Sequence, residues 1–131
     1  MIKVYPSETQ GREFYADMGR FFADLSIAKE LERQVYNKPD TTWYVAQQWN
    51  LIYGFVSVNE TKNYYFIDNF YIIPEWRGQN RGSELIEHIV EDFTDKPLKC
   101  VANNPAAIHI FKSCGFVEDG HNGKYTKFIK H

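Results

Sequence analysis

The sequence contains few of the residues that mark specialised protein classes. It has two cysteines in 131 residues, Cys100 and Cys114, too few for a disulfide scaffold or a cysteine-rich zinc site. The 15 basic and 17 acidic side chains leave a formal net charge of −2, which disfavours a protein that wraps nucleic acid through a basic field. No apolar run approaches the ~20 residues that a bilayer requires, and residues 1–7 lack the apolar stretch of a signal peptide. We therefore expect a cytoplasmic protein with no membrane and no nucleic acid as partner.

Apolar and aromatic residues, by contrast, are plentiful. Hydrophobic residues make up 44% of the chain, enough to bury a core, and a length of 131 residues predicts a single domain over residues 1–131. The 3 Trp, 9 Tyr and 10 Phe residues are an unusually large share. Such a chain has a well-filled core, a groove lined with aromatic rings, or both.

Hydrophobic periodicity predicts a mixed α/β fold. Strands are expected at residues 2–5, 41–47, 51–58, 64–73, 98–102, 116–118 and 124–129. Helices are expected to open at Ser7 (with a Ser7–Gln10 capping box), near Ser26, after Ser83 and at Asn104, where Asn and Pro105 form a strong helix start. Phe14, Met18, Phe21 and Leu25 are expected to form the buried face of the first helix. The resulting order, β-αα-βββ-α-β-α-ββ, is an α/β fold with a mixed central sheet flanked by helices.

A loop with two glycines and two arginines precedes the helix expected after Ser83. Its glycines are Gly78 and Gly82, and its arginines are Arg77 and Arg81. A glycine-containing loop that enters a helix presents unpaired backbone N–H groups at the positive end of that helix, and phosphates fit such a site. Arginine adds charge that can pair with phosphate in bidentate fashion. The loop has neither the Walker A lysine nor the dinucleotide-binding glycine pattern, so on its own it is a weak signal.

Two motifs give the chain a resemblance to a known family. Residues 72–82, which include Arg77-Gly78-Gln79-Asn80-Arg81-Gly82, resemble the strand-and-loop signature of the GNAT superfamily of acyl-CoA N-acyltransferases, Arg/Gln-x-x-Gly-x-Gly/Ala. Residues 104–116 are similar to the second motif of that family, Asn-x-x-Ala-x-x-x-Tyr-x-x-x-Gly-Phe. The hairpin at residues 43–58 also resembles the second and third strands of the family. The resemblance therefore covers most of the chain, with both motifs in the family's order.

The resemblance implies an acetyl-CoA-dependent N-acetyltransferase with a GNAT-like sheet and no metal. It implies that the CoA pyrophosphate is bound by the loop residues Arg77, Gly78, Gln79, Asn80, Arg81, Gly82 and Ser83. The backbone of Ile72 and Ile73 would pair with the pantetheine arm like an added strand. Asn104 and the helix face bearing Phe111 would line the thioester end of the tunnel.

Two residues depart from the family pattern. Asn80 replaces the middle glycine of the loop; since Asn best tolerates a left-handed backbone and can cap a helix, we expect it to preserve the loop, and the alternative is that its side chain intrudes on the phosphates. Phe111 stands where the family has a tyrosine that protonates the departing thiolate, a role worth about 10²–10⁴-fold. A thiol with a pKa of about 8.5 leaves readily, so water or a helix N-terminus could suffice. Tyr71 and Tyr125 are alternative donors whose location the sequence leaves open.

The remaining chemistry is a base that deprotonates the acceptor amine. Asp68 is the only acidic residue in the strand at residues 64–73, where the family places such a carboxylate, and its alternative role is a strand residue bound by backbone donors. The acceptor stays open among a small amine, a protein N-terminus, a lysine and an aminoglycoside, as does a homodimer. The alternative function is a GNAT-like CoA-binding or protein-interaction module with weak or no activity. A third, weaker hypothesis is an acyl-CoA other than acetyl-CoA.

Overall fold

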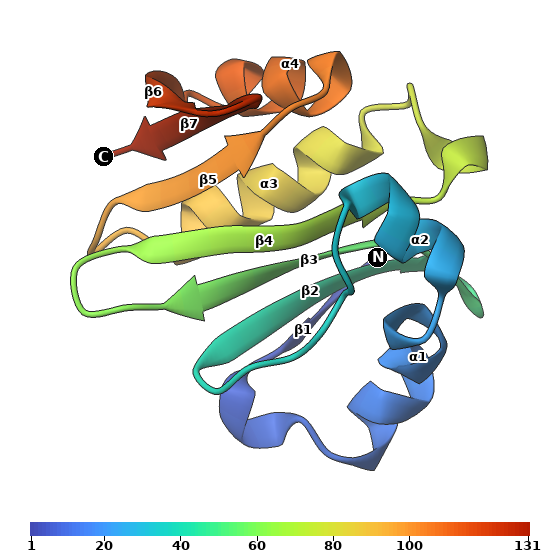
Figure 1. Cartoon of the computed structure of the whole chain (residues 1–131). Helices are drawn as coiled ribbons and strands as arrows, with labels where there is room; N and C mark the ends of the chain where they lie inside the picture. The colour runs from blue at the N-terminus through green and yellow to red at the C-terminus, as the bar shows by residue number, and fades with distance from the viewer.

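In the computed structural model, which describes residues 1–131, seven strands form one mixed sheet in the order β1-β2-β3-β4-β5-β7-β6 (Figure 1). The strands are β1 (Ile2–Tyr5), β2 (Thr41–Gln48), β3 (Leu51–Glu60), β4 (Tyr65–Ile72), β5 (Leu98–Ala102), β6 (Val117–Asn122) and β7 (Tyr125–Lys130). The helices are α1 (Arg12–Phe22), α2 (Leu25–Leu31), α3 (Arg81–Asp92) and α4 (Pro105–Ser113), with 3-10 turns at Ser7–Thr9 and Pro74–Trp76. The predicted order of elements and the α/β fold with a mixed sheet are confirmed.

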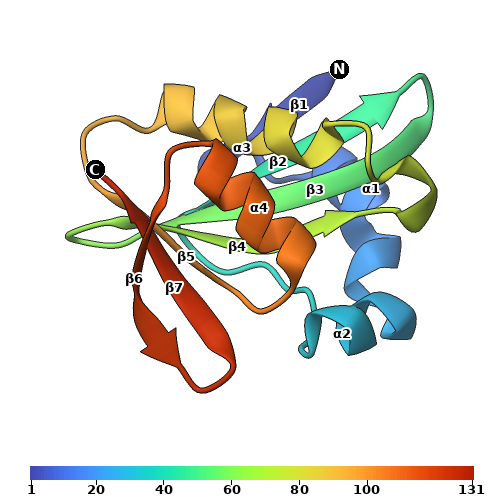
Figure 2. The same ribbon diagram turned by 90° about the horizontal axis from the view of Figure 1, so that it is seen from above.

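The helices cover both faces of the sheet, which therefore has two apolar cores. α3 and α4 lie on one face, and α1 and α2 lie on the other (Figure 2). Leu85, Ile86 and Ile89 of α3 are completely buried against the first face. Phe14 and Met18 of α1 are completely buried against the second. The aromatic residues predicted to fill a core do so, because most of them lie in these two layers.

The N-terminal helices begin at other residues than the sequence predicts. Ser7 opens only a 3-10 turn, and α1 begins at Arg12 after Gly11, so the predicted Ser7–Gln10 capping box is wrong. Gln10 instead donates hydrogen bonds from its amide to the carbonyls of Tyr5 and Thr41, at 3.1 and 2.6 Å. This side chain ties the turn to the sheet instead of closing a helix.

Leu25 is also placed differently from the prediction. It is 84% exposed, because α1 ends before it and Asp24 caps a new helix, accepting N–H groups from Ser26 and Ile27. The apolar spacing continues across a helix break, and periodicity alone gives no sign of that break.

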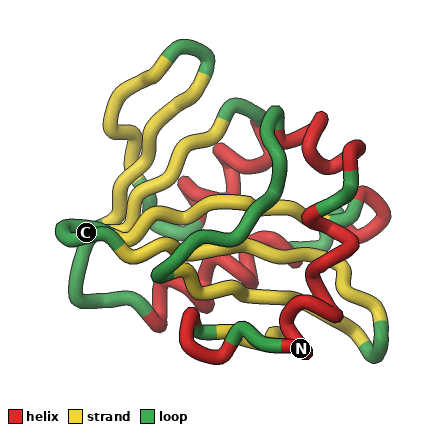
Figure 3. Tube along the Cα trace, turned by 60° about the horizontal axis from the view of Figure 1, so that its bottom comes forward, coloured by secondary structure: helices red, strands yellow, loops and turns green.

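The segment between α2 and β2, residues 32–40, crosses the sheet on the α1/α2 face (Figures 1 and 3). Asn37 holds it there: its Oδ1 accepts the indole N–H of Trp43 at 2.8 Å, and its amide donates to Gln10 Oε1 at 2.7 Å. Val35, within the segment, is buried. No helix of the structure is long and apolar enough to cross a membrane.

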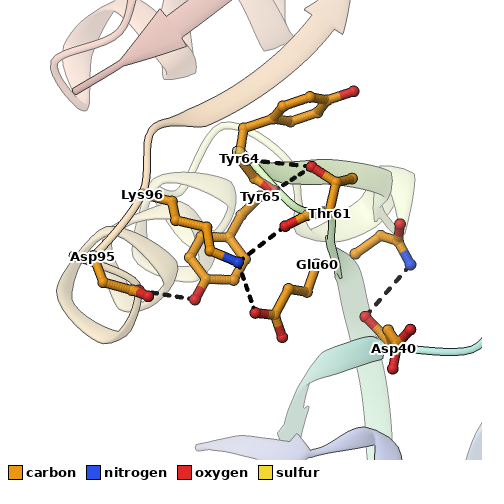
Figure 4. Close-up of polar contacts among 8 residues, drawn as sticks. Asp40, Glu60, Thr61, Tyr64, Tyr65, Asp95 and Lys96 are labelled. Atoms are coloured by element: carbon orange, nitrogen blue, oxygen red, sulfur yellow. Dashed lines mark hydrogen bonds and ion pairs between the residues drawn. The ribbon is translucent and has the colours of Figure 1, made fainter.

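The parallel pair β4/β5 is the shortest ladder in the sheet. Only Tyr65 with Leu98 and Phe66 with Lys99 are in register; beyond them the two strands diverge, as Figure 1 shows. Figure 4 shows how the paired end is fastened: Lys96 donates to Glu60 Oε2 and to the carbonyl of the neighbouring Thr61, at 2.8 and 2.9 Å. At the same end the Tyr65 hydroxyl donates to an Asp95 carboxylate oxygen at 2.8 Å. The strands are thus clamped at one end and open at the other.

Candidate functional site

A cleft of about 1150 Å³ opens where β4 and β5 diverge. Its floor includes Phe70, Tyr71 and Ile72 at the end of β4. The loop before α3 and the first turns of α3 form one wall, and the start of α4 forms the other. Two residues of α2, Glu30 and Leu31, close it from the opposite face of the sheet. The carboxyl ends of neighbouring parallel strands are a common location for ligand sites in α/β proteins.

The loop before α3 is shaped by two left-handed residues. Gly78 has φ +78°, and Asn80 has φ +61° and ψ 16°. The expectation that Asn80 adopts the left-handed backbone of a glycine is confirmed. Its side chain makes no capping hydrogen bond, so the expected cap is wrong; its carbonyl accepts the N–H of Glu84 at 3.1 Å. Because a helix leaves its first N–H groups without intrahelical partners, those of Arg81, Gly82 and Ser83 open towards the cleft that these residues line.

The two loop arginines have different surroundings. Arg77 makes two polar contacts within the protein: its Nε donates to the Ile72 carbonyl at 2.8 Å, and its Nη2 pairs with Glu30 at 2.5 Å. It therefore links α2 to the loop. Arg81, at the start of α3, lies over the rings of Tyr53 and Trp76, with its guanidinium carbon 5.1 and 5.0 Å from their centroids.

The rings of Tyr53 and Trp76, over which Arg81 lies, form a rigid stack. Their rings are stacked at a centroid distance of 4.7 Å and an interplanar angle of 11°. Trp76 lines the cleft, and the sequence analysis did not select it. The sequence signal that could have identified Trp76 as a site residue is its position between a strand and a glycine-containing loop. The stack fixes Arg81 in place while its charge stays at the cleft, since a cation is attracted to the face of an aromatic ring.

The structure brings most of the predicted cofactor residues to one cleft. Those that line it are Ile72, Arg77, Gly78, Asn80, Arg81, Gly82, Ser83 and Asn104. Asn104 caps α4, its Oδ1 accepting the Ala107 N–H at 2.9 Å, as predicted. Gln79 belongs to the same loop but does not line the cleft.

Ile73 and Phe111 lie outside the cleft. The Ile73 N–H donates to the Tyr53 carbonyl at 2.8 Å and the Ile73 carbonyl accepts from Trp76 N–H at 2.9 Å, so its backbone is already paired. The expectation that the Ile73 backbone is free to pair with an added chain is therefore wrong. Phe111 is 2% exposed and packs its ring against Phe70, 5.8 Å between centroids, in the core beneath the cleft. Since its ring faces the core, Phe111 supports the wall without lining it.

Asp68 is placed on the other face of the sheet. Its carboxylate pairs with the Arg33 guanidinium, and its Oδ1 accepts the Asn69 N–H at 2.9 Å. Its side chain is only 13% exposed and does not line the cleft. The structure therefore places this carboxylate on β4, beneath the segment that follows α2 and away from the phosphate loop.

The two tyrosines that the sequence left open differ in position. Tyr71 lines the cleft, and its burial raises the pKa of its phenol, so the group stays protonated at neutral pH. Tyr125 instead donates its hydroxyl to Glu32 at 2.6 Å, an arrangement that raises its pKa, and it does not line the cleft. Tyr71 is thus the phenol within reach of a bound ligand. The structure assembles no group of three or more His, Cys, Asp or Glu side chains that could hold a metal ion.

Comparison with known families agrees with the arrangement of loop, cleft and strands. A sequence model of the acetyltransferase (GNAT) domain matches residues 39–118, which include the β2–β3 hairpin, the phosphate-loop candidate and α4. The chain belongs to the GNAT family. A search of curated proteins gave no significant match.

Solved structures share this fold, two of them over the whole chain. Escherichia coli ElaA superposes with a TM-score of 0.77, covering 100% of this chain and 99% of ElaA at 10% identity. An acyl-CoA N-acyltransferase from Pseudomonas aeruginosa gives 0.76, with 100% and 99% coverage at 12% identity. A Bacillus anthracis structure in complex with acetyl coenzyme A gives 0.61, with 77% and 70% coverage at 24% identity. At such identities the likeness shows that this chain has the GNAT fold.

Proposed function

We propose that this GNAT protein transfers an acetyl group from acetyl-CoA directly to a primary amine. The observation that carries the proposal is the cleft at the open end of β4 and β5, where a left-handed loop and the start of α3 present unpaired N–H groups beside Arg81. An anion at a helix N-terminus is stabilised by those N–H groups and by the helix dipole. The pyrophosphate of the cofactor is the matching ligand. Membership of the GNAT family supports the same assignment.

The thioester arm of the cofactor would then lie along the open edge of β4. Beyond Phe66 this edge has no partner strand, since only two residue pairs join β4 to β5. An extended chain with amide groups can add to such an edge through backbone hydrogen bonds. At Ile72 the backbone N–H is the group proposed to pair with the arm, because the Ile72 carbonyl already accepts a hydrogen bond from Arg77. Asn104 and Phe70 line the space into which the acetyl end would reach.

In the proposed reaction the amine nitrogen attacks the thioester carbonyl carbon, the C–S bond breaks, and CoA leaves as a thiolate. Asp68 is the proposed base, taking the amine proton through a water molecule from the α1/α2 side of β4. Tyr71, whose side chain lines the cleft, is the proposed donor of a proton to the departing sulfur. Backbone N–H groups of β4 would stabilise the oxyanion. No acetyl-enzyme forms, so sequential kinetics are expected.

The first test is thermal unfolding with and without acetyl-CoA or CoA. A ligand at 100 times its Kd adds ~2.7 kcal/mol to stability, a rise in Tm on the order of 10 °C for a chain of this size. Turnover is then measured as free thiol released from acetyl-CoA with a panel of primary amines. Absence of both a shift and turnover would overturn the proposal.

The role of Asp68 has its own test. Asp68→Asn keeps the side chain's shape and should lower kcat by about 10²–10⁴-fold while leaving the Kd of acetyl-CoA unchanged within twofold. Asp92→Asn is the matched control: this carboxylate accepts the Tyr44 hydroxyl at 2.6 Å and does not line the cleft. Wild-type turnover in Asp68→Asn would exclude Asp68 as the base.

A second candidate function is CoA binding without turnover. It is favoured by the position of Asp68, which is paired with Arg33, and of Phe111, which lies in the core. In that case both CoA and acetyl-CoA raise the Tm, while no amine in the panel accelerates thiol release. The same two measurements therefore separate the two functions.

A further inference from the structure

β4 contains a β-bulge close to the point where it leaves β5. Ser57 of β3 is paired with Asp68 and Phe55 with Tyr71, so two steps along β3 correspond to three along β4. Asn69, within the longer stretch, has φ +51°. An extra residue in one strand locally interrupts the ladder and turns two consecutive side chains to one face.

The contacts of the bulge show which face this is. Asp68 pairs with Arg33, which follows α2. The Asn69 amide donates to Ser57 Oγ at 2.9 Å and approaches the Tyr36 carbonyl at 3.5 Å. Arg33 and Tyr36 both belong to the segment that crosses the α1/α2 face. Two neighbouring residues of β4 thus point to the same side of the sheet.

The bulge reverses the alternation of the residues that follow it. Ile67, before the bulge, packs in the α3/α4 core. After it, Phe70 packs against Phe111 on the α3/α4 side, while Tyr71 packs against Phe55 on the α1/α2 side. In a regular strand counted from Ile67, Phe70 and Tyr71 would exchange faces, because side chains alternate with a period of two. The bulge therefore determines which β4 side chains form the floor of the cleft.

Two buried polar side chains hold the bulge. Asn69 is 5% exposed and Ser57 is 1% exposed, on strands whose other buried residues are apolar or aromatic. Besides accepting from Asn69, the Ser57 hydroxyl donates to the Asp68 carbonyl at 3.1 Å, which secures the backbone on the other side of the bulge. Buried polar groups are costly unless they are hydrogen-bonded, and Asn tolerates the left-handed backbone that this position requires. Asn69 adopts the left-handed backbone that the bulge requires, and Ser57 supplies the hydrogen-bond acceptor for the Asn69 side-chain amide.

We infer that Asn69 and Ser57 are positioning residues: their hydrogen bond holds the β4 bulge, and the bulge places Phe70 and Tyr71 correctly around the acyl-CoA cleft. The inference concerns the site of the proposed function, and it specifies two residues that line neither the cleft nor the phosphate loop.

A double-mutant cycle tests the inference. Asn69→Gly keeps the left-handed backbone and removes the amide; Ser57→Ala removes the hydroxyl. Each is expected to raise the Kd of CoA, measured by titration calorimetry, about tenfold, equivalent to 1.4 kcal/mol. The double variant is also expected to bind about tenfold more weakly, not a hundredfold, because both changes remove one shared contact. The control is Met18→Ala, which opens a cavity in the core between α1 and the sheet. This variant is expected to have a lower Tm and a Kd within twofold of the wild-type value.

Hydrogen exchange provides a readout that needs no ligand. In both single variants the amides of residues 67–72 should exchange at least tenfold faster relative to those of β2, and in Met18→Ala they should not. Wild-type Kd and exchange in the single variants, additive effects in the double variant, or an equal effect in Met18→Ala would overturn the inference. If the wild-type protein binds no CoA, the proposed function fails, and the exchange measurement alone decides the role of the bulge.

Discussion

Gly82, in the first turn of α3, and Gly19, inside α1, are helical glycines with very different surroundings. A Cβ added at Gly82 would lie 2.9 Å from Ile110 Cδ1 and 3.0 Å from Phe70 Cζ, where α3, α4 and β4 meet. A Cβ added at Gly19, inside α1, would meet nothing within 4 Å. Neither glycine has a positive φ, so replacement by alanine is free of backbone strain at both positions. The pair Gly82→Ala and Gly19→Ala therefore compares a crowded helix position with an open one.

The expected magnitudes have opposite signs. Alanine in a helix interior is more favourable than glycine by about 0.5–1 kcal/mol, so Gly19→Ala should raise the Tm by about 2–4 °C. At Gly82 the same gain is opposed by overpacking, which typically costs about 1–3 kcal/mol. Ile110 can relieve part of the clash because the nearest atom is the end of a flexible side chain. We expect a net loss of about 1 kcal/mol and a fall in Tm of roughly 3–4 °C.

The same substitution should also affect ligand binding. Phe70 and Ile110 both line the cleft, so a methyl group that displaces them narrows it. CoA binding to Gly82→Ala, measured by calorimetry at a temperature where both variants are folded, should be weaker by about tenfold, or 1.4 kcal/mol. Gly19→Ala should bind CoA like the wild type. A Gly82→Ala protein that is more stable than the wild type, or that binds CoA equally well, would refute the packing argument.

Three further perturbations have defined outcomes. Asn104→Ala removes the cap of α4 and should cost about 1 kcal/mol, seen as a Tm lower by roughly 3–4 °C in thermal unfolding. Arg81→Gln removes the cation beside Trp76 and should raise the Kd of CoA about tenfold in 50 mM salt and less in 1 M salt, where charges are screened; equal loss at both salt concentrations would argue against a phosphate contact. Hydrogen bonds led by that from Lys124 lower the pKa of Glu32 below its ordinary value of 4.5, so this contact stabilises the fold above about pH 4.5 and is lost as the pH falls through the lowered pKa. Glu32→Gln should flatten that acid dependence in Tm measured from pH 6 to pH 3, and an unchanged profile would contradict the assignment.

The fold could be predicted from the sequence because local signals and tertiary contacts agree through most of the chain. Asn104 and Pro105 fix the start of α4 by their own chemistry, and the structure has the helix there. The left-handed backbone of Asn80 followed from the tolerance of that side chain. Around α1 the signals conflict: Gln10 reaches to the sheet, a contact 31 residues away in sequence. A capping pattern involves only neighbouring residues, whereas here the distant contact of Gln10 takes the side chain that the predicted capping box requires.

The site was only partly predictable for the same reason. The loop residues are consecutive, so one motif locates them together. The surroundings of Asp68 and Phe111 depend on residues far apart in the sequence: Arg33 pairs with the first, and Phe70 packs against the second. The sequence analysis places one strand at residues 64–73 and does not predict the bulge at Asn69, because a bulge is defined by the register with the neighbouring strand β3. Its signal was the pair Asp-Asn inside an otherwise apolar and aromatic run, since both residue types are depleted in strands.

The open end of the β4/β5 pair gives the protein a sheet edge in its interior. Outer edges recruit other chains, and proteins usually protect them with charge, proline or short length. This inner edge is protected by its surroundings instead: the starts of α3 and α4 stand on one side, and Glu30 and Leu31 of α2 stand on the other. Helices on both sides thus screen an unpaired sheet edge that still borders the cleft, so the fold keeps backbone hydrogen-bonding groups available there without an edge strand at its surface.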